Sequence, residues 1–356
     1  MTRYLLAGGG TAGHVNPLLA LAEAIKAQPG VNEVWALGTR EGLESRLVPE
    51  RGFPLLTIDR LPMPRRFDSY AIGFPFKFLK AVDKVKQYIE KHQIDVVVGF
   101  GGYASAPAYR AAKSLNIPYV VHEANALAGY ANRVGARNAA AVAITFPITK
   151  LPQATLTGLP LRKEIVELAK IDHRFEANQY FDLDPKLTTL LVTGGSLGAR
   201  KINETIEQAR TLLEAAGIQV IHIVGDRAGL EDTEVGGYRR IAYCSRMELA
   251  IAAADFAVAR SGAATVSEFS AVGLPAIYIP YPVGNGEQKL NAEAVVAAGG
   301  ANLVLDQDFT LEYVASTLIP LLSNKKAITS MQEKAKSVGI TTGSTSLLKL
   351  VNGVLS

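Results

Sequence analysis

Two glycine-rich turns, one in each half of the chain, constrain the fold more than any other feature. The first, Gly8–Gly13, follows the apolar run Arg3–Ala7, and the second, Gly194–Arg200, follows the apolar run Thr188–Thr193. A stretch with a helical pattern follows each turn, at Pro17–Ala27 and at Lys201–Ala216. A buried strand, a glycine turn and a helix open a doubly wound sheet, and the N-terminus of that helix attracts phosphate. The sequence therefore predicts an α/β chain with two doubly wound, Rossmann-like domains in tandem.

The remaining apolar runs support this organisation because they alternate with helical patterns, which favours parallel sheets. The runs lie at 33–37, 95–98, 119–121 and 141–145 in the first half and at 219–224, 241–242, 256–259 and 276–279 in the second. Glycine and proline gather at 156–160. We therefore expect an N-terminal domain at 1–159 and a C-terminal domain at 160–340, and a chain of 356 residues suits two domains.

The composition excludes several classes of protein. With 48% hydrophobic and 20% charged residues the chain is not disordered, and no apolar run approaches the length of a membrane-spanning helix. The first residues lack the pattern of a signal peptide, and the single cysteine, Cys244, excludes a disulfide framework, so we expect an intracellular protein. The charge is divided unevenly: residues 1–160 carry 18 Lys or Arg against 11 Asp or Glu, and residues 161–356 carry 19 against 22. A plain small-molecule enzyme does not require this polarity.

The first turn contains the pattern G-x-G-x-x-G, which also occurs in dinucleotide-binding oxidoreductases. Those enzymes need an acidic residue at the end of the second strand, where this chain has Leu37–Arg40. An NADP-dependent oxidoreductase with an arginine on the 2′-phosphate remains an alternative, and the glycines could also serve close strand–helix packing alone. His14 follows the turn near a helix N-terminus, which favours a neutral imidazole able to act as a base; a purely structural histidine is the alternative.

The segment Arg260–Glu268 has the composition of a diphosphate site. It follows a strand, opens a helix and has only small residues at Gly262–Ala264, so backbone N–H groups and the helix dipole can face an anion. Glu268 lies one turn after Thr265 on the same helix face and could bind the ribose hydroxyls of a nucleotide. The two residues could instead form only a capping box. The polar loop Gly284–Asn291 could read sugar hydroxyls.

Two further segments of the first half carry polar groups. Phe100–Pro107 is another glycine turn that lets the backbone approach a bulky polar group. His122, Glu123 and Asn125 lie close together, but no second histidine or acid stands at helical spacing to complete a metal site. Asn125 is better suited to hydrogen-bonding hydroxyl groups or an amide.

Aromatic and basic residues alternate in an aromatic–basic strip between Leu61 and Lys80, which contains a single acid. This pattern fits a surface that rests on an anionic membrane, although half of it could be core and the rest a solvated loop. Nucleic-acid binding is disfavoured because no nucleic-acid-binding motif accompanies the strip. The candidate membrane contacts are Arg65, Arg66, Phe74, Phe76, Lys77, Phe78 and Lys80.

Seven segments, in the same order along the whole chain, resemble the MurG family of peptidoglycan N-acetylglucosaminyltransferases. They are GGGTAGHVNP, GFGGYASAP, HEANALAGYANR, GLPLR, GGSLGAR, RSGAATVSE and GNGEQKLNA. The resemblance implies a GT-B fold, in which the two domains face each other across a cleft and a final helix at 341–356 packs back on the first domain. It also implies transfer of N-acetylglucosamine from UDP-N-acetylglucosamine to lipid I, which gives lipid II at the cytoplasmic face of the membrane.

The resemblance also implies roles for individual residues. His14 matches the catalytic base, Glu268 the ribose contact, and the backbone near Cys244 the uracil contact. The implied donor contacts are Thr11, Gly13, Asn125, Arg162, Ser196, Cys244, Ala263, Ala264, Thr265, Glu268, Glu287 and Gln288, and the implied acceptor or diphosphate contacts are Gly10, Gly101, Gly102 and Tyr103. Leu159 and Glu287 depart from the family pattern, which often has Asn and Gln at these positions.

The chemistry that we expect is inverting glycosyl transfer without a metal or another cofactor. His14 removes the proton of the C4 hydroxyl of the muramyl sugar, and the helix that starts near Thr265 stabilises the leaving diphosphate. No D-x-D motif occurs within the two segments expected to bind the donor, 260–268 and 284–291. The expected partners are the donor, lipid I, an anionic membrane surface and cell-wall and division proteins. The alternatives are a UDP-sugar 2-epimerase of the same fold, the NADP-dependent oxidoreductase and a non-enzymatic membrane scaffold.

Overall fold

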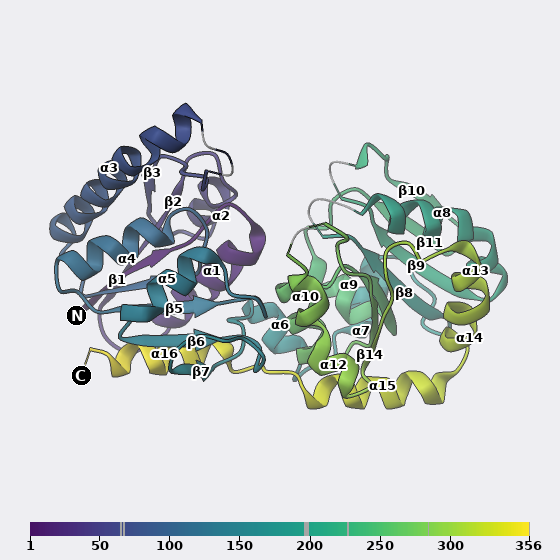
Figure 1. Ribbon diagram of the computed structural model, residues 1–356. Helices are drawn as coiled ribbons and strands as arrows, with labels where there is room; N and C mark the ends of the chain where they lie inside the picture. Colours follow the sequence, from purple (N-terminus) through teal and green to yellow (C-terminus); the bar gives the residue numbers. More distant parts are fainter. Residues whose placement is uncertain (65, 67, 196–198, 226–227, 284, 356) are drawn as a thin grey trace. The chain divides into compact units, whose positions relative to one another are not determined.

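The chain folds into two units that do not follow the sequence order strictly, because the last helix belongs to the first unit. The computed structural model describes residues 1–64, 66, 68–195, 199–225, 228–283 and 285–355. Unit 1 comprises Met1–Arg162 and Thr342–Ser356, and unit 2 comprises Lys163–Thr341 (Figure 1). The C-terminal helix therefore belongs to the same unit as the N-terminal strand.

Unit 1 is a parallel sheet with helices on both faces (Figure 1). Its strands are β1 (Thr2–Ala7), β2 (Asn32–Thr39), β3 (Leu55–Ile58), β4 (Val96–Gly99), β5 (Tyr119–Glu123), β6 (Ala141–Ile144) and β7 (Ala154–Leu156). Its helices are α1 (Ala12–Lys26), α2 (Glu44–Glu50), α3 (Ser69–Lys91), α4 (Ser105–Ser114), α5 (Tyr130–Gly135), the short η1 (Ala136–Asn138) and α16 (Gly343–Gly353). The apolar residues of α1, α2 and α16 pack on one face of the sheet, and those of α3 and α4 pack on the other.

Unit 2 repeats this plan. Its strands are β8 (Thr188–Thr193), β9 (Ile218–Ile223), β10 (Thr233–Val235), β11 (Tyr238–Ile241), β12 (Phe256–Ala259), β13 (Ala276–Tyr278) and β14 (Ala301–Leu303). Its helices are α6 (Lys163–Leu168), α7 (Arg174–Tyr180), α8 (Arg200–Ala215), α9 (Met247–Ala253), α10 (Ala263–Val272), α11 (Glu287–Asn291), α12 (Glu293–Ala297), α13 (Leu311–Tyr313), η3 (Val314–Leu318), α14 (Ile319–Leu322) and α15 (Lys325–Ser337). One apolar core lies between this sheet and the helices α8, η3 and α14.

Both sheets reverse their strand order beside their first strand. The order is β3-β2-β1-β4-β5-β6-β7 in unit 1 and β10-β11-β9-β8-β12-β13-β14 in unit 2. Open α/β sheets bind ligands at the carboxyl ends of their strands, at the point where the order reverses. This point lies between β1 and β4 in unit 1 and between β8 and β12 in unit 2, directly at the predicted turns. The predicted fold class of two doubly wound α/β domains is confirmed.

Two elements differ from the sequence-based prediction. The first helix begins at Ala12 rather than at Pro17, because the backbone N–H of Val15 already bonds to Thr11 O at 3.1 Å, so His14 lies inside its first turn. The antiparallel hairpin of β10 and β11 was predicted only as a strand at 241–242. Its residues escape detection as an apolar run because they include two consecutive ion-paired arginines, Arg239 and Arg240.

Candidate active site

The two glycine turns of unit 1 meet at the switch point of its sheet. A Cβ atom on Gly102 would lie only 2.6 Å from the carbonyl oxygen of Gly9. Gly101 and Gly102 have φ angles of +92° and +79°, which glycine adopts without strain. Ser105 Oγ accepts a hydrogen bond from Gly101 N–H (2.9 Å) and lies 2.9 Å from Ala7 O, which ties the second turn to the end of β1.

The imidazole of His14 lies between these turns. Its Nδ1 is 3.0 Å from the carbonyl oxygen of Gly9 and 3.4 Å from Thr11 Oγ1. A carbonyl oxygen only accepts hydrogen bonds, so Nδ1 carries the proton and Nε2 of the neutral ring carries the lone pair. Nε2 faces the second turn, because a Cβ atom on Gly101 would lie 3.2 Å from it. The half-buried ring thus has the tautomer of a general base that acts through Nε2.

A carboxylate that the sequence analysis missed lies against the first turn. Glu44, the first residue of α2, is fully buried. Its Oε1 accepts hydrogen bonds from the N–H and the hydroxyl of Thr39 (2.8 and 2.7 Å), and its Oε2 accepts one from Gly10 N–H (2.8 Å). Three glycines leave room for this side chain, since a Cβ atom would lie 2.3, 2.4 and 2.1 Å from it at Gly9, Gly38 and Gly42.

A second buried carboxylate organises the loop that contains Asn125. Glu123, at the end of β5, accepts hydrogen bonds from the N–H groups of Asn125 and Gly129 and from Asn132 Nδ2, each at 2.9 Å. Asn132 accepts a hydrogen bond from the hydroxyl of Tyr109 (2.8 Å). Glu123 therefore fixes the backbone at Asn125, the predicted sugar contact.

The other candidates of unit 1 are His122, Tyr103 and Arg162. His122 is fully buried with Nε2 3.2 Å from Gly158 O, and burial lowers its pKa to about 4, so it is neutral at physiological pH. Tyr103 is half-buried, and the guanidinium of Arg60, which the sequence analysis did not select, lies 5.2 Å from the centre of its ring. Arg162 is half-buried at the end of the first segment of unit 1.

In unit 2, α10 begins at the switch point with glycine as its N-cap. Gly262 has an extended backbone and is followed by Ala263 and Ala264, so the first N–H groups of the helix are flanked by small side chains. Thr265 and Glu268 lie inside the helix rather than at its N-cap, which excludes the capping-box interpretation. Glu268 is 9% exposed, one turn from the helix start.

Arg260 supports the loop that precedes the two predicted sugar contacts. Its buried guanidinium forms an ion pair with Asp306 (2.5 Å) and donates to the carbonyl groups of two residues that follow β13 (3.2 and 3.1 Å). Further along this loop, the side chain of Gln288 accepts a hydrogen bond from Tyr281 N–H (2.9 Å). Glu287 is half-buried at the start of α11.

Cys244 is half-buried in a segment that is anchored at both ends. At one end, Ala242 N–H donates a hydrogen bond to Asp232 Oδ1 (2.7 Å). At the other end, Arg246 forms ion pairs with two carboxylates. The backbone that was predicted to contact uracil is therefore fixed from both sides.

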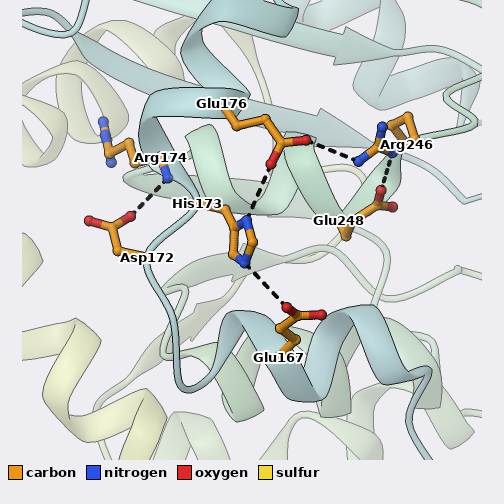
Figure 2. Close-up of polar contacts among 7 residues, drawn as sticks. All are labelled: Glu167, Asp172, His173, Arg174, Glu176, Arg246 and Glu248. Carbon is orange, nitrogen blue, oxygen red and sulfur yellow. Dashed lines mark hydrogen bonds and ion pairs between the residues drawn. The ribbon is translucent and has the colours of Figure 1, made fainter.

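Figure 2 shows the polar network around Arg246, which the sequence analysis did not predict. The guanidinium pairs with Glu176 of α7 (3.3 Å) and with Glu248 of α9. His173 lies between Glu176 (3.3 Å) and Glu167 of α6 (3.9 Å). Three helices are thus connected to the same segment through polar side chains.

The aromatic–basic strip lies mainly on α3. Ile72, Phe76 and Leu79 follow a helical spacing and are exposed, Phe76 by 76%. Phe74 and Phe78 are half-buried and pack against the core of unit 1. Exposed cations accompany the apolar stripe at Arg66, Lys77 and Lys80. Ile72 and Leu79 were not among the predicted membrane contacts.

Two predicted residues, Arg65 and Ser196, lie outside the described residues. Within the part of the chain that the structure describes, no cluster of three or more His, Cys, Asp or Glu side chains could hold a metal ion. No described helix has both the length and the apolar character needed to cross a bilayer.

The chain matches two family models. The glycosyltransferase family 28 N-terminal domain matches residues 4–144, and the glycosyltransferase family 28 C-terminal domain matches residues 189–350. The two matches together cover most of the chain, and each contains one of the two switch points described above.

Curated proteins are similar over the full length. The UDP-N-acetylglucosamine–N-acetylmuramyl-(pentapeptide) pyrophosphoryl-undecaprenol N-acetylglucosamine transferase of Clavibacter michiganensis subsp. michiganensis is 53% identical, over 100% of this chain and 97% of that protein. Proteins of the same name from Leifsonia xyli subsp. xyli and Streptomyces coelicolor are 52% and 47% identical, over 100% and 94% of this chain and 99% and 93% of theirs.

Solved structures agree with these relatives. The crystal structure of Acinetobacter baumannii MurG has a TM-score of 0.79 at 28% identity and covers 99% of this chain and 100% of that chain. A putative UDP-N-acetylglucosamine 2-epimerase from Listeria monocytogenes has a TM-score of 0.70 at 14% identity over 99% of this chain and 96% of that chain, which shows a shared fold alone. The resemblance found in the sequence is confirmed. The chain therefore belongs to glycosyltransferase family 28 and, within it, to the MurG family of N-acetylglucosamine transferases.

Proposed function

We propose that this chain transfers N-acetylglucosamine from UDP-N-acetylglucosamine to the C4 hydroxyl of the muramyl sugar of lipid I, giving lipid II. Relatives at 46–53% identity are named for this transfer. Within the site, the observation that carries the proposal is His14, whose Nδ1 is held by the carbonyl oxygen of Gly9. This contact leaves Nε2 as a proton acceptor at the switch point of unit 1.

Transfer is a single displacement with inversion at the anomeric carbon. Nε2 of His14 accepts the proton of the C4 hydroxyl while the hydroxyl oxygen forms a bond to the anomeric carbon. The bond between that carbon and the diphosphate breaks, and its electron pair leaves with UDP. The imidazolium that results carries a proton on each nitrogen, and its Nδ1–H remains hydrogen-bonded to the carbonyl oxygen of Gly9.

Most donor contacts in this proposal lie in unit 2. The N-terminus of α10 faces the diphosphate through the N–H groups of Ala263, Ala264 and Thr265, and the helix dipole stabilises the negative charge that develops on it, with no metal ion required. Glu268 accepts hydrogen bonds from the ribose hydroxyls. The other proposed donor contacts are the backbone near Cys244 and the side chains or turns at Thr11, Gly13, Asn125, Arg162, Ser196, Glu287 and Gln288.

Labelled N-acetylglucosamine and lipid I in detergent test the reaction, with EDTA present to test metal independence. We expect transfer by the wild-type chain and a raised KM for the donor in Glu268→Ala, because the ribose loses its carboxylate. Glu333→Ala, an exposed glutamate within α15 of the same unit, is the matched control and keeps the wild-type KM. The absence of transfer by the wild-type chain, or epimerisation of free UDP-N-acetylglucosamine without lipid I, contradicts the proposal.

The acceptor is a lipid, and we propose that the strip on α3 brings unit 1 to the cytoplasmic face of the membrane. Exposed apolar side chains flanked by lysines bind anionic bilayers by burying apolar area and by charge attraction. We expect Phe76→Asp to reduce co-sedimentation with anionic phospholipid vesicles. Phe175→Asp on α7 is a matched control, since Phe175 and Phe76 are 77% and 76% exposed. Equal losses in the two variants contradict this assignment.

A further inference from the structure

We propose that Glu44 is a positioning residue for His14 and acts through the peptide group that joins Gly9 to Gly10. The C=O of this peptide group accepts the Nδ1–H of His14 at 3.0 Å, and its N–H donates to Glu44 Oε2 at 2.8 Å. A buried carboxylate, a peptide group and the imidazole thus form one hydrogen-bonded chain. The part of this inference that concerns turnover rests on the proposed function, whereas the part that concerns the tautomer of His14 does not.

The surroundings fix the plane of this peptide group. Glu44 cannot move away from it, because the other carboxylate oxygen accepts two hydrogen bonds from Thr39, and Gly9 and Gly38 pack directly against the side chain. In addition, Gly102 approaches the Gly9 carbonyl so closely that no side chain fits between them. The carbonyl dipole therefore points at Nδ1 before substrate binds.

The charge of Glu44 adds to this orientation. Its carboxylate is fully buried, where hydrogen bonds to a charged group are stronger and polarise the next bond in a chain. Polarisation of the Gly10 N–H increases the negative charge on the Gly9 oxygen, which stabilises the Nδ1–H tautomer and the imidazolium formed in the reaction. In Ser-His-Asp triads the aspartate does this by direct contact, and its loss costs about 10⁴-fold in kcat. We expect a smaller effect here because a peptide group intervenes.

Glu44 also limits what the first turn can bind. A glycine turn before a helix offers its N–H groups to phosphate, but the N–H of Gly10 already donates to Glu44. A diphosphate that approached this N–H would meet a buried negative charge, which argues against the acceptor or diphosphate contact that the resemblance implied for Gly10. The Gly9–Gly10 peptide group thus bonds to His14 and Glu44 rather than to a phosphate. In this respect the turn differs from dinucleotide-binding turns with the same glycine pattern.

Long-range ¹H–¹⁵N correlation spectra of the full-length, substrate-free chain measure the tautomer directly, with His14→Gln used to assign the signals. We expect the Nδ1–H form in the wild-type chain and a shift toward the Nε2–H form in Glu44→Gln. The amide of glutamine cannot accept from both Thr39 N–H and Gly10 N–H, so the chain of hydrogen bonds is broken. An Nε2–H tautomer in the wild-type chain, or an unchanged tautomer in Glu44→Gln, overturns the proposal.

Kinetics separate positioning from simple loss of stability. We expect Glu44→Gln to lower kcat on the order of 10- to 100-fold with the KM for UDP-N-acetylglucosamine unchanged, because the base is displaced while the donor site is intact. Thr39→Val removes one of the two hydrogen bonds from Thr39 to the same carboxylate but keeps the contact with Gly10. It should lose stability, keep the Nδ1–H tautomer and lose less kcat than Glu44→Gln. Glu50→Gln, at the exposed end of α2, controls for the charge change.

The outcomes are distinguishable. If Thr39→Val and Glu44→Gln lose kcat in proportion to their loss of thermal stability, Glu44 is only structural and the proposal is wrong. If the wild-type chain makes no lipid II, the proposed function fails, while the tautomer spectra still decide whether Glu44 sets the state of His14.

Discussion

Replacement of Gly102 by alanine tests whether the contact between the two glycine turns positions the base. The new methyl group would lie 2.6 Å from the carbonyl oxygen of Gly9, which is backbone and cannot rotate away. The φ angle of +79° costs a non-glycine residue roughly 1–2 kcal/mol, and overpacking adds about 1–3 kcal/mol. The free energy of unfolding should therefore fall by about 2–5 kcal/mol in Gly102→Ala.

Gly52→Ala isolates the contact from the backbone strain. Gly52 belongs to the same unit and has a φ angle of +75°, but a Cβ atom there would have no neighbour within 4 Å. Its alanine variant therefore carries only the backbone cost. We expect Gly102→Ala to unfold at a temperature roughly 3–10 °C below that of Gly52→Ala, because each kcal/mol shifts the midpoint by a few degrees in a domain of this size.

The kcat of transfer to lipid I should differ between Gly102→Ala and Gly52→Ala more than their stability does. Displacement of the Gly9 carbonyl moves the partner of His14 Nδ1, and a misplacement of about 1 Å can cost on the order of 100-fold in kcat. We therefore expect Gly102→Ala to lose most of its transfer to lipid I, measured below its unfolding temperature, while Gly52→Ala keeps the wild-type kcat. Equal kcat and equal stability in the two variants would refute the reasoning.

Three further predictions follow from the site. His14→Ala should lower turnover in the lipid I assay by about 10²- to 10⁴-fold, and near-normal turnover would remove this residue from the mechanism. His222, in β9, is fully buried like His122. Burial lowers the pKa of both histidines from 6.5 to about 4, so the unfolded chain takes up protons first as the pH falls. The free energy of unfolding should then decrease between about pH 6.5 and pH 4, by roughly 3 kcal/mol for each histidine, and denaturant titrations of His122→Gln should show a shallower decrease. Arg246→Met leaves the largely buried Glu248 without its cation and removes one anchor of the segment that contains Cys244. Isothermal titration should therefore show weaker UDP binding to this variant. Unchanged UDP binding contradicts the anchoring role of Arg246.

The parts of the fold that were predictable are those in which one local pattern settles the structure. Apolar runs buried on both faces gave the central strands, and the glycine turns that follow β1 and β8 located both switch points. The hairpin of β10 and β11 was not predictable in the same way. Its strands contain Arg239 and Arg240, whose charges are balanced by Asp182, Glu234 and Glu207 from other segments, and such pairing leaves no periodic signal.

In the candidate site, too, residues with a local sequence pattern were predictable, whereas contacts between distant segments were not. His14 was predictable because the turn, the helix start and the residue are neighbours in the sequence. The network of Arg246 was not, because its carboxylates come from α7 and α9 and each looks like an ordinary surface charge in its own helix. Membrane contacts were predicted by composition, but α3 turns Phe74 and Phe78 toward the core and Phe76 toward solvent.

Glu44 explains why the dinucleotide pattern was ambiguous. Leu37–Arg40, at the end of the second strand, contains no acid. The carboxylate of Glu44 nevertheless lies at that strand end, where it accepts hydrogen bonds from the N–H and the hydroxyl of Thr39. Its burial requires glycine at three separated positions, a condition that becomes visible only when the strands are placed side by side. A cofactor ribose would need this acid to face solvent, whereas here it faces Gly10. The same glycine pattern and a nearby acid can therefore serve either a ligand or the protein's own base, and the direction of the carboxylate decides between them.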